Sequence, residues 1–139
     1  MALKASKNKR SGIPDNHNNS RFFEEVNIGV DIENIGRFNG LTKEFLERVY
    51  TAKEISYCLS KSNPAQHYAG RFAGKEAVIK VLSGFGIKTD YCEIEIANNA
   101  GGAPMVTPKR EYGGIDILIS ISHCDDKAIA FALGRKRAV

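Results

Sequence analysis

Several features that would place this chain in a specialised class are missing from it. Across its 139 residues, no apolar run approaches the roughly 20 residues that a membrane-spanning helix needs. The N-terminus also lacks the short apolar segment of a secretory signal. The three cysteines are widely separated and never in a Cys-x-x-Cys spacing, which argues against a disulfide framework or a zinc site. No repeat of solenoid period is present. These absences favour a cytoplasmic protein with one domain.

The positive charge of the chain is confined to its ends. The chain has 20 basic and 16 acidic side chains in total. Residues 1–21 contain five basic groups and one acidic group, and residues 135–139 contain three basic groups and no acidic one. The body between these tails therefore has 12 basic and 15 acidic groups and a net charge of −3. A nucleic-acid-binding protein acting through basic tails is one alternative function. The negative body and the lack of an interleaved basic and aromatic motif argue against it.

Composition divides the chain into a folded domain and two tails. Residues 1–21 are rich in Lys, Asn and Ser and nearly free of apolar side chains, so we expect them to be disordered. They could be a solubilising tail, a leader segment or the edge of a larger polypeptide. We expect the domain to span residues 22–134 and a basic C-terminal tail to follow at 135–139.

The spacing of apolar residues predicts a strand and then helices in the first part of the chain. Residues 26–31 are typical of a short buried strand, and residues 34–50 have helical spacing. The sequence beginning at Thr51 is a capping box that starts a second helix. Asn63 as N-cap, with proline at the first helical position, then predicts a long helix over 64–82.

The period changes from 3.6 residues to two in the second part of the chain. Alternation predicts strands over residues 92–97, 103–107, 115–122 and 128–133. Helices followed by an antiparallel meander indicate an α+β fold, with an N-terminal strand and helices, one of them long, packed on a small antiparallel sheet.

One acidic residue of the long helix, Glu76, is in an unexpected position. It falls within an arc of roughly 120° together with Phe72, Ala73, Ile79 and Lys80. This arc predicts a core-facing stripe, where an ionised carboxylate costs several kcal/mol unless a cation or donors meet it. Lys80, one turn away, could form an ordinary ion pair with it. Alternatively, Glu76 could share a divalent metal with Asp31, which ends the first strand.

Three short motifs in order resemble the 4′-phosphopantetheinyl transferases, specifically the short holo-[acyl carrier protein] synthase type. These motifs are GVDI at residues 29–32, GRFAGKEAVIK at 70–80 and SISH at 120–123. The segments at 45–51 and 102–104 match two further parts of the family pattern. Each motif is weak alone, but their order and spacing together are specific.

This resemblance implies an activity and a set of roles. Such enzymes move the phosphopantetheine arm of coenzyme A onto a serine of an apo acyl carrier protein and release 3′,5′-ADP. By the motif match, Asp31 and Glu76 would hold Mg²⁺ against the coenzyme A pyrophosphate, and Lys80 would neutralise phosphate oxygens. The proton of the serine would pass either to Glu76 or to a water on the metal.

The same resemblance assigns residues to the coenzyme A pocket. Arg71 would lie near the 3′-phosphate and His123 near the pyrophosphate. Pro104 in the hairpin and Gly84 in the turn after the long helix would also line this pocket.

Finally, the resemblance implies partners. Arg37 and Arg48 would face an acidic acyl carrier protein, and the chain would form a homotrimer with coenzyme A bound between subunits. A shared site is physically sensible because a chain this small has too little surface to enclose so large a ligand. Two alternatives are a non-catalytic domain that binds coenzyme A or carrier protein, and a transferase domain of a larger fatty acid synthase. Retention of both Asp31 and Glu76 argues against the non-catalytic one.

Overall fold

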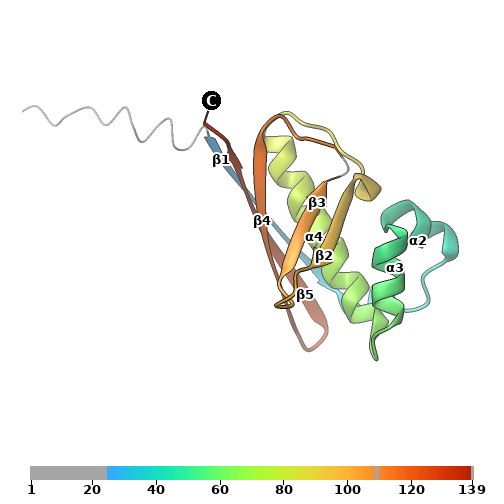
Figure 1. Cartoon of the computed structure of the whole chain (residues 1–139). Coiled ribbons are helices and arrows are strands. Elements are labelled where there is room, and N and C mark those ends of the chain that lie inside the picture. The colour runs from blue at the N-terminus through green and yellow to red at the C-terminus, as the bar shows by residue number, and fades with distance from the viewer. Residues whose placement is uncertain (1–24, 109, 139) are drawn as a thin grey trace, which may run out of the picture.

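The computed structural model describes residues 25–108 and 110–138 (Figure 1). The expected disorder of residues 1–21 therefore lies outside the described residues. Within the described part, a strand is followed by helices and then by antiparallel strands, which confirms the predicted α+β fold.

Four helical elements directly follow the first strand, and two of them begin at the caps predicted from the sequence, Thr51 and Asn63. Thr42, Thr51 and Asn63 are the N-caps of the three α-helices, and each side chain accepts a backbone N–H of the first turn. The elements are β1 (Val26–Asn34), the 3₁₀ helix η1 (Ile35–Phe38), α2 (Lys43–Val49), α3 (Ala52–Leu59) and α4 (Pro64–Gly84).

The prediction of a single helix over residues 34–50 is wrong for the first half of this range. Strand β1 continues to Asn34, and η1 then ends at Phe38. Gly40 has a φ of +65°, a conformation that glycine adopts without steric cost, and it separates η1 from α2.

The strands form two sheets rather than one meander. The first sheet has the order β1-β5-β4, all antiparallel, with β4 at Ile115–Cys124 and β5 at Lys127–Lys136. Arg135 and Lys136, expected in the C-terminal tail, therefore belong to β5. The second sheet is the hairpin of β2 (Ile94–Asn98) and β3 (Pro104–Pro108), which follows the 3₁₀ helix η2 (Tyr91–Glu93).

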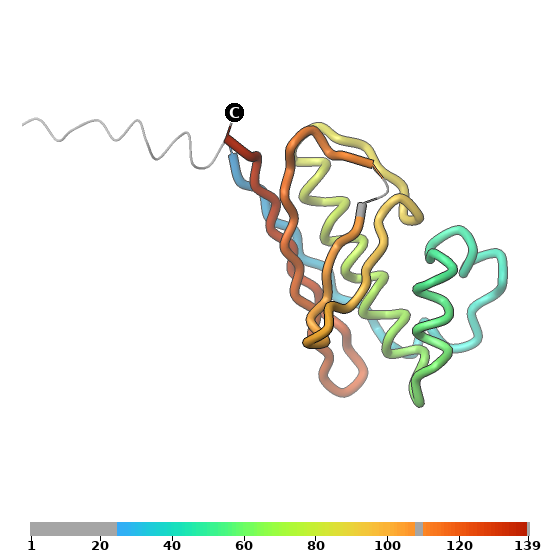
Figure 2. The backbone as a smooth tube through the Cα atoms, in the orientation of Figure 1, coloured from blue at the N-terminus to red at the C-terminus, as the bar shows by residue number. Residues whose placement is uncertain are grey.

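Helix α4 lies along the three-stranded sheet and joins all parts of the fold (Figures 1 and 2). Its C-terminal half packs against the sheet and the β2-β3 hairpin, through buried side chains such as Val78, Leu82 and Ile96. Its N-terminal half packs with η1, α2 and α3 in a second, aromatic-rich cluster that includes Tyr50 and Tyr68. The fold therefore fixes α4 on several sides at once.

A glycine allows β1 to approach this helix closely. A side chain on Gly29 would collide with the backbone carbonyl oxygen of Ala77, so only glycine fits there. This contact places the following residue on the same face of β1, Asp31, beside α4.

The opposite face of the three-stranded sheet is apolar and exposed. Cross-strand partners share this face in three rows: Ile28 with Leu133 and Leu118, Val30 with Phe131, and Ile32 with Ile129. Six of these side chains are between 41% and 71% exposed. We call the six, Ile28, Val30, Ile32, Leu118, Ile129 and Phe131, the apolar sheet face. None of the helices in the described part of the chain has the length and apolar character needed to cross a bilayer.

Candidate functional site

The structure brings Asp31 and Lys80 together. The Lys80 ammonium lies 3.2 Å from Oδ1 of Asp31 and donates a 2.7 Å hydrogen bond to the backbone carbonyl of Val30. The second oxygen of Asp31, Oδ2, is buried and has no hydrogen-bond partner within the described residues. An unpartnered carboxylate oxygen of this kind is costly unless a ligand meets it.

The predicted core-facing stripe of α4 is in fact its least buried side. Ala73 is fully buried, but Phe72, Glu76 and Ile79 are only partly buried, and Lys80 is exposed. The sheet covers one side of α4 and α3 and β2 cover another, so the apolar spacing runs almost around the whole helix. Glu76 is not paired with Lys80; its Oε1 accepts a hydrogen bond from the hydroxyl of Tyr91. Burial and this hydrogen bond raise the pKa of Tyr91 to about 12.

A third carboxylate, Glu33, belongs to the site and was missed in the sequence. It lies two residues after Asp31 on the same face of β1 and is buried, and Arg37 Nη1 contacts its Oε2 at 3.0 Å. Burial, the adjacent Asp31 carboxyl group and the negative charge of Glu76 raise the pKa of Glu33 to about 7, against the opposing effect of Arg37. The alternation of acidic residues in β1 is the signal that could have identified it.

These residues fit a hard cation, although they do not by themselves complete a metal site. Within residues 25–108 and 110–138, no group of three or more His, Cys, Asp or Glu side chains has the arrangement of one. The unpartnered Oδ2 of Asp31 nevertheless offers a buried oxygen ligand, and the carboxylates of Asp31 and Glu76 act on Glu33 with negative charge, in addition to the larger effect of burial. Mg²⁺ commonly takes one or two protein carboxylates and leaves its other positions to phosphates and water.

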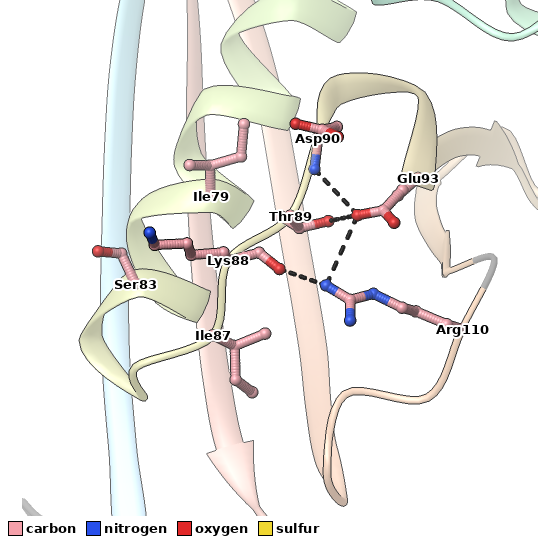
Figure 3. Close-up of a pocket in the computed structure, with 8 residues that line it drawn as sticks. All are labelled: Ile79, Ser83, Ile87, Lys88, Thr89, Asp90, Glu93 and Arg110. Carbon is pink, nitrogen blue, oxygen red and sulfur yellow. Dashed lines mark hydrogen bonds and ion pairs between the residues drawn. The ribbon is translucent and has the colours of Figure 1, made fainter.

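A shallow groove continues the open stripe of α4 (Figure 3). It is lined by Ile79, Ser83, Ile87, Lys88, Thr89, Asp90, Glu93 and Arg110. Ile79 and Ser83 lie one and two turns beyond Glu76 on the same side of the helix. The Glu93 carboxylate is held by the Thr89 hydroxyl at 2.8 Å and by the Asp90 N–H at 3.0 Å. The groove thus extends the carboxylate site along the helix.

Arg71 lies on a different side of α4. It lies five positions before Glu76, which places the two side chains about 140° apart around the helix axis. The Arg71 guanidinium stacks over the Tyr57 ring, 3.9 Å from its centroid, and donates a 3.0 Å hydrogen bond to Asn98 Oδ1. Its Nε is buried without a partner in the described part of the chain.

The remaining predicted residues are spread over other elements. His123 lies near the end of β4, with its Nε2 2.8 Å from the Gln66 amide nitrogen. Pro104 begins β3, and Gly84 ends α4 against the side chain of Asn27. Within one chain, these contacts do not connect His123, Pro104 or Arg71 to Asp31. Arg37 and Arg48 are exposed, on η1 and in the last turn of α2.

The sequence that builds this fold matches a known family of transferases. Residues 27–132 match the sequence model of the 4′-phosphopantetheinyl transferase superfamily, and the chain belongs to this superfamily. The resemblance found in its motifs is thereby confirmed.

Individual relatives of the chain have more specific names than the superfamily. A protein of Chlorobaculum parvum named holo-[acyl-carrier-protein] synthase is 44% identical over 113 residues, which cover 78% of this chain and 97% of that protein. The solved ACPS–CoA complex of Chronobacterium ammoniagenes matches with a TM-score of 0.71 at 28% identity, over 81% of this chain and 98% of that one. The fatty acid synthase subunit alpha of Schizosaccharomyces pombe is 36% identical over 119 residues, which are 79% of this chain and 6% of that subunit.

Proposed function

We propose that this chain is a holo-[acyl carrier protein] synthase. It transfers the 4′-phosphopantetheine arm of coenzyme A to a serine hydroxyl of an apo acyl carrier protein and releases 3′,5′-ADP. The similarity to a protein named holo-[acyl-carrier-protein] synthase, which covers 97% of that protein, supports this assignment. The observation that carries it is the Asp31 carboxylate: its Oδ2 is buried without a hydrogen-bond partner in the described residues, and its Oδ1 contacts the Lys80 ammonium of the helix that also carries Glu76.

The reaction breaks a bond at one phosphorus of the pyrophosphate and forms a bond from the same phosphorus to the serine oxygen. A Mg²⁺ ion held by Asp31 and Glu76 would neutralise charge on the pyrophosphate. Lys80 has three N–H donors; one serves Asp31 and one the Val30 carbonyl, so the third can meet a phosphate oxygen. We assign Glu76 as the group of this chain that accepts the serine proton, because Tyr91 occupies only its Oε1 and leaves Oε2 without a hydrogen-bond partner among the described residues.

We also propose a homotrimer in which the apolar sheet face is covered by two further copies of the chain. An exposed apolar patch of this extent is unusual on a monomer and typical of an interface. Arg71, His123 and Pro104 are separated from Asp31 within one chain, so a coenzyme A site that uses all of them needs residues from a neighbouring subunit.

The carrier protein is proposed to bind beside η1 and α2. Arg37 is 68% exposed in its side chain while its guanidinium contacts Glu33 at the carboxylate site, so an acidic partner there is brought directly to the reacting groups. Arg48 adds a second exposed positive charge in the last turn of α2.

The similarity to the S. pombe subunit favours a second candidate, in which the same transfer occurs within a larger fatty acid synthase. The two candidates differ in the substrate that the chain accepts. A separate synthase modifies a free carrier protein, whereas a synthase-linked domain would act poorly on one in solution.

The proposed function is tested with two variants of the carboxylates. We expect Asp31→Asn and Glu76→Gln to lose more than about 100-fold in transfer rate while their far-UV CD spectra stay unchanged. Glu111→Gln, which removes a charge from an exposed position between β3 and β4, is the control and should transfer normally. Full activity in both carboxylate variants would refute the proposed site. A wild-type protein that binds coenzyme A without transferring would favour the non-catalytic domain.

A further inference from the structure

The side chain of Glu76 has a single hydrogen-bond partner within the described residues, and this partner comes from outside α4. The hydroxyl of Tyr91, in η2, donates to Glu76 Oε1. Because this hydrogen bond occupies one carboxylate oxygen, it also fixes the direction in which the other oxygen points. The hydroxyl has no part in the reaction as described above.

The ring of Tyr91 is held by an aromatic cluster. It stacks on Phe72 with ring centroids 5.4 Å apart and an angle of 22° between the ring planes. Phe72 in turn packs against Phe38 of η1 at 5.4 Å and Phe45 of α2 at 6.4 Å. Phe72, itself held by residues of two further elements, thus restricts the orientation of the phenol.

The backbone of Tyr91 is held from the other side by a buried charge. The ammonium of Lys75, which is fully buried, donates a 2.8 Å hydrogen bond to the Tyr91 carbonyl. Lys75 is itself paired with Glu54 at 2.8 Å, and Glu54 also accepts the N–H of Ile96 at 2.8 Å. The thiol of Cys92, the next residue, contacts the Arg48 carbonyl at 3.1 Å. Both ends of the tyrosine are therefore anchored.

We propose that Tyr91 is a positioning residue that orients the Glu76 carboxylate for metal binding and transfer. This inference rests on the proposed function, because that function requires Glu76 to bind a metal ion. Hydrogen-bond partners of metal-binding carboxylates typically contribute 10–100-fold to metal affinity or activity. The Lys75–Glu54 pair and the aromatic cluster serve to keep the phenol in place.

Tyr91→Phe tests this role because it keeps the stacked ring and removes only the hydroxyl. The first readout is the affinity for Mn²⁺. It is measured by electron paramagnetic resonance on protein that is saturated with coenzyme A and contains no carrier protein. We expect the Mn²⁺ affinity to fall about tenfold. The second readout is steady-state transfer, in which kcat should fall about tenfold while KM for the carrier protein stays within about twofold.

Tyr112→Phe is the matched control. Its hydroxyl lies 3.3 Å from both Thr89 Oγ1 and the Glu93 carbonyl, so the variant removes a tyrosine hydroxyl near η2 without touching Glu76. Mn²⁺ affinity and kcat should stay at wild-type values in this control. In a Glu76→Gln background, Tyr91→Phe should cause no further loss of Mn²⁺ affinity, because the two groups act through one contact.

The outcomes separate this inference from the proposed function. Wild-type Mn²⁺ affinity and kcat in Tyr91→Phe would overturn the inference while leaving the transferase intact. An equal loss in Tyr112→Phe would also overturn it, since general loosening of the segment would then explain the effect. A wild-type protein that neither binds Mn²⁺ nor transfers would refute the proposed function, and the inference with it.

Discussion

Replacement of Phe131 by glutamate is expected to convert the proposed trimer into monomers. Phe131 lies on β5, the central strand of the three-stranded sheet, and pairs with Val30 on one side and Ser120 on the other. Its side chain projects from the apolar sheet face and is 43% exposed, so the substitution places a charge in the middle of the proposed interface without disturbing the core of the subunit.

The magnitude follows from the exposed fractions. Complete burial of a large apolar side chain contributes about 1.5–3 kcal/mol, so the six side chains, roughly half exposed, offer about 1 kcal/mol each, or roughly 6 kcal/mol per subunit. The glutamate removes about 1 kcal/mol of this and adds a desolvation penalty of several kcal/mol for an unpaired carboxylate. Symmetry repeats the change in all three subunits.

The assay is the molar mass in solution, by light scattering after gel filtration at micromolar protein. The wild-type chain of 15.3 kDa should elute as a species of about 46 kDa, and Phe131→Glu as a monomer. Transfer activity should disappear with the trimer, because the proposed coenzyme A site needs residues of two subunits. Leu59→Glu is the control: Leu59 is 63% exposed at the end of α3, away from this face, and its variant should remain trimeric.

Two results would refute the reasoning. A monomeric wild-type protein with full activity would remove the shared site. A Phe131→Glu variant that remains trimeric would show that the apolar sheet face is not the interface.

Three further predictions concern the interior and the edges of the site. Lys75→Met should lower the free energy of unfolding by about 3–5 kcal/mol in urea, because it leaves a buried carboxylate without its cation; a loss below about 1 kcal/mol would contradict this. Arg37→Glu should raise KM for the carrier protein about tenfold and leave KM for coenzyme A unchanged, and equal increases in both would remove its proposed role. The pKa of Glu33 is about 7 in the folded protein against an ordinary 4.5, so its contribution to stability is complete below pH 4.5 and is lost as the pH rises through 7. In the presence of a chelator, the free energy of unfolding of the wild type should therefore fall by up to about 3 kcal/mol relative to that of Glu33→Gln between pH 5 and pH 8. Parallel pH profiles of the free energy of unfolding in the two proteins would contradict this.

Local signals predicted much of the fold. The capping box at Thr51 and the Asn63-Pro64 pair mark the starts of α3 and α4 because they act through hydrogen bonds between residues close in sequence. Strict alternation similarly located β4 and β5. The pairing of β1 with β5, and the separation of the β2-β3 hairpin from that sheet, depend on contacts across most of the chain and left no local signal.

The candidate site was predicted in part. Asp31, Glu76 and Lys80 were predicted as site residues, and this assignment stays a prediction. Of the two alternatives for Glu76, the ion pair with Lys80 is not formed, because β1 approaches α4 at Gly29 and brings Asp31 to the lysine instead. Periodicity could not show which side of α4 stays open, since apolar residues cover most of its circumference. The hydroxyl of Tyr91 reaches Glu76 only through the tertiary packing of η2.

The intact mass of an apo acyl carrier protein tests the central claim most directly. The carrier is incubated with this protein, coenzyme A and Mg²⁺, and a parallel sample contains a chelator. The account predicts a gain of one phosphopantetheine group per carrier, with 3′,5′-ADP released in equal amount, and no gain in chelator. No gain with several carrier proteins, in a folded sample that binds coenzyme A, would contradict the account.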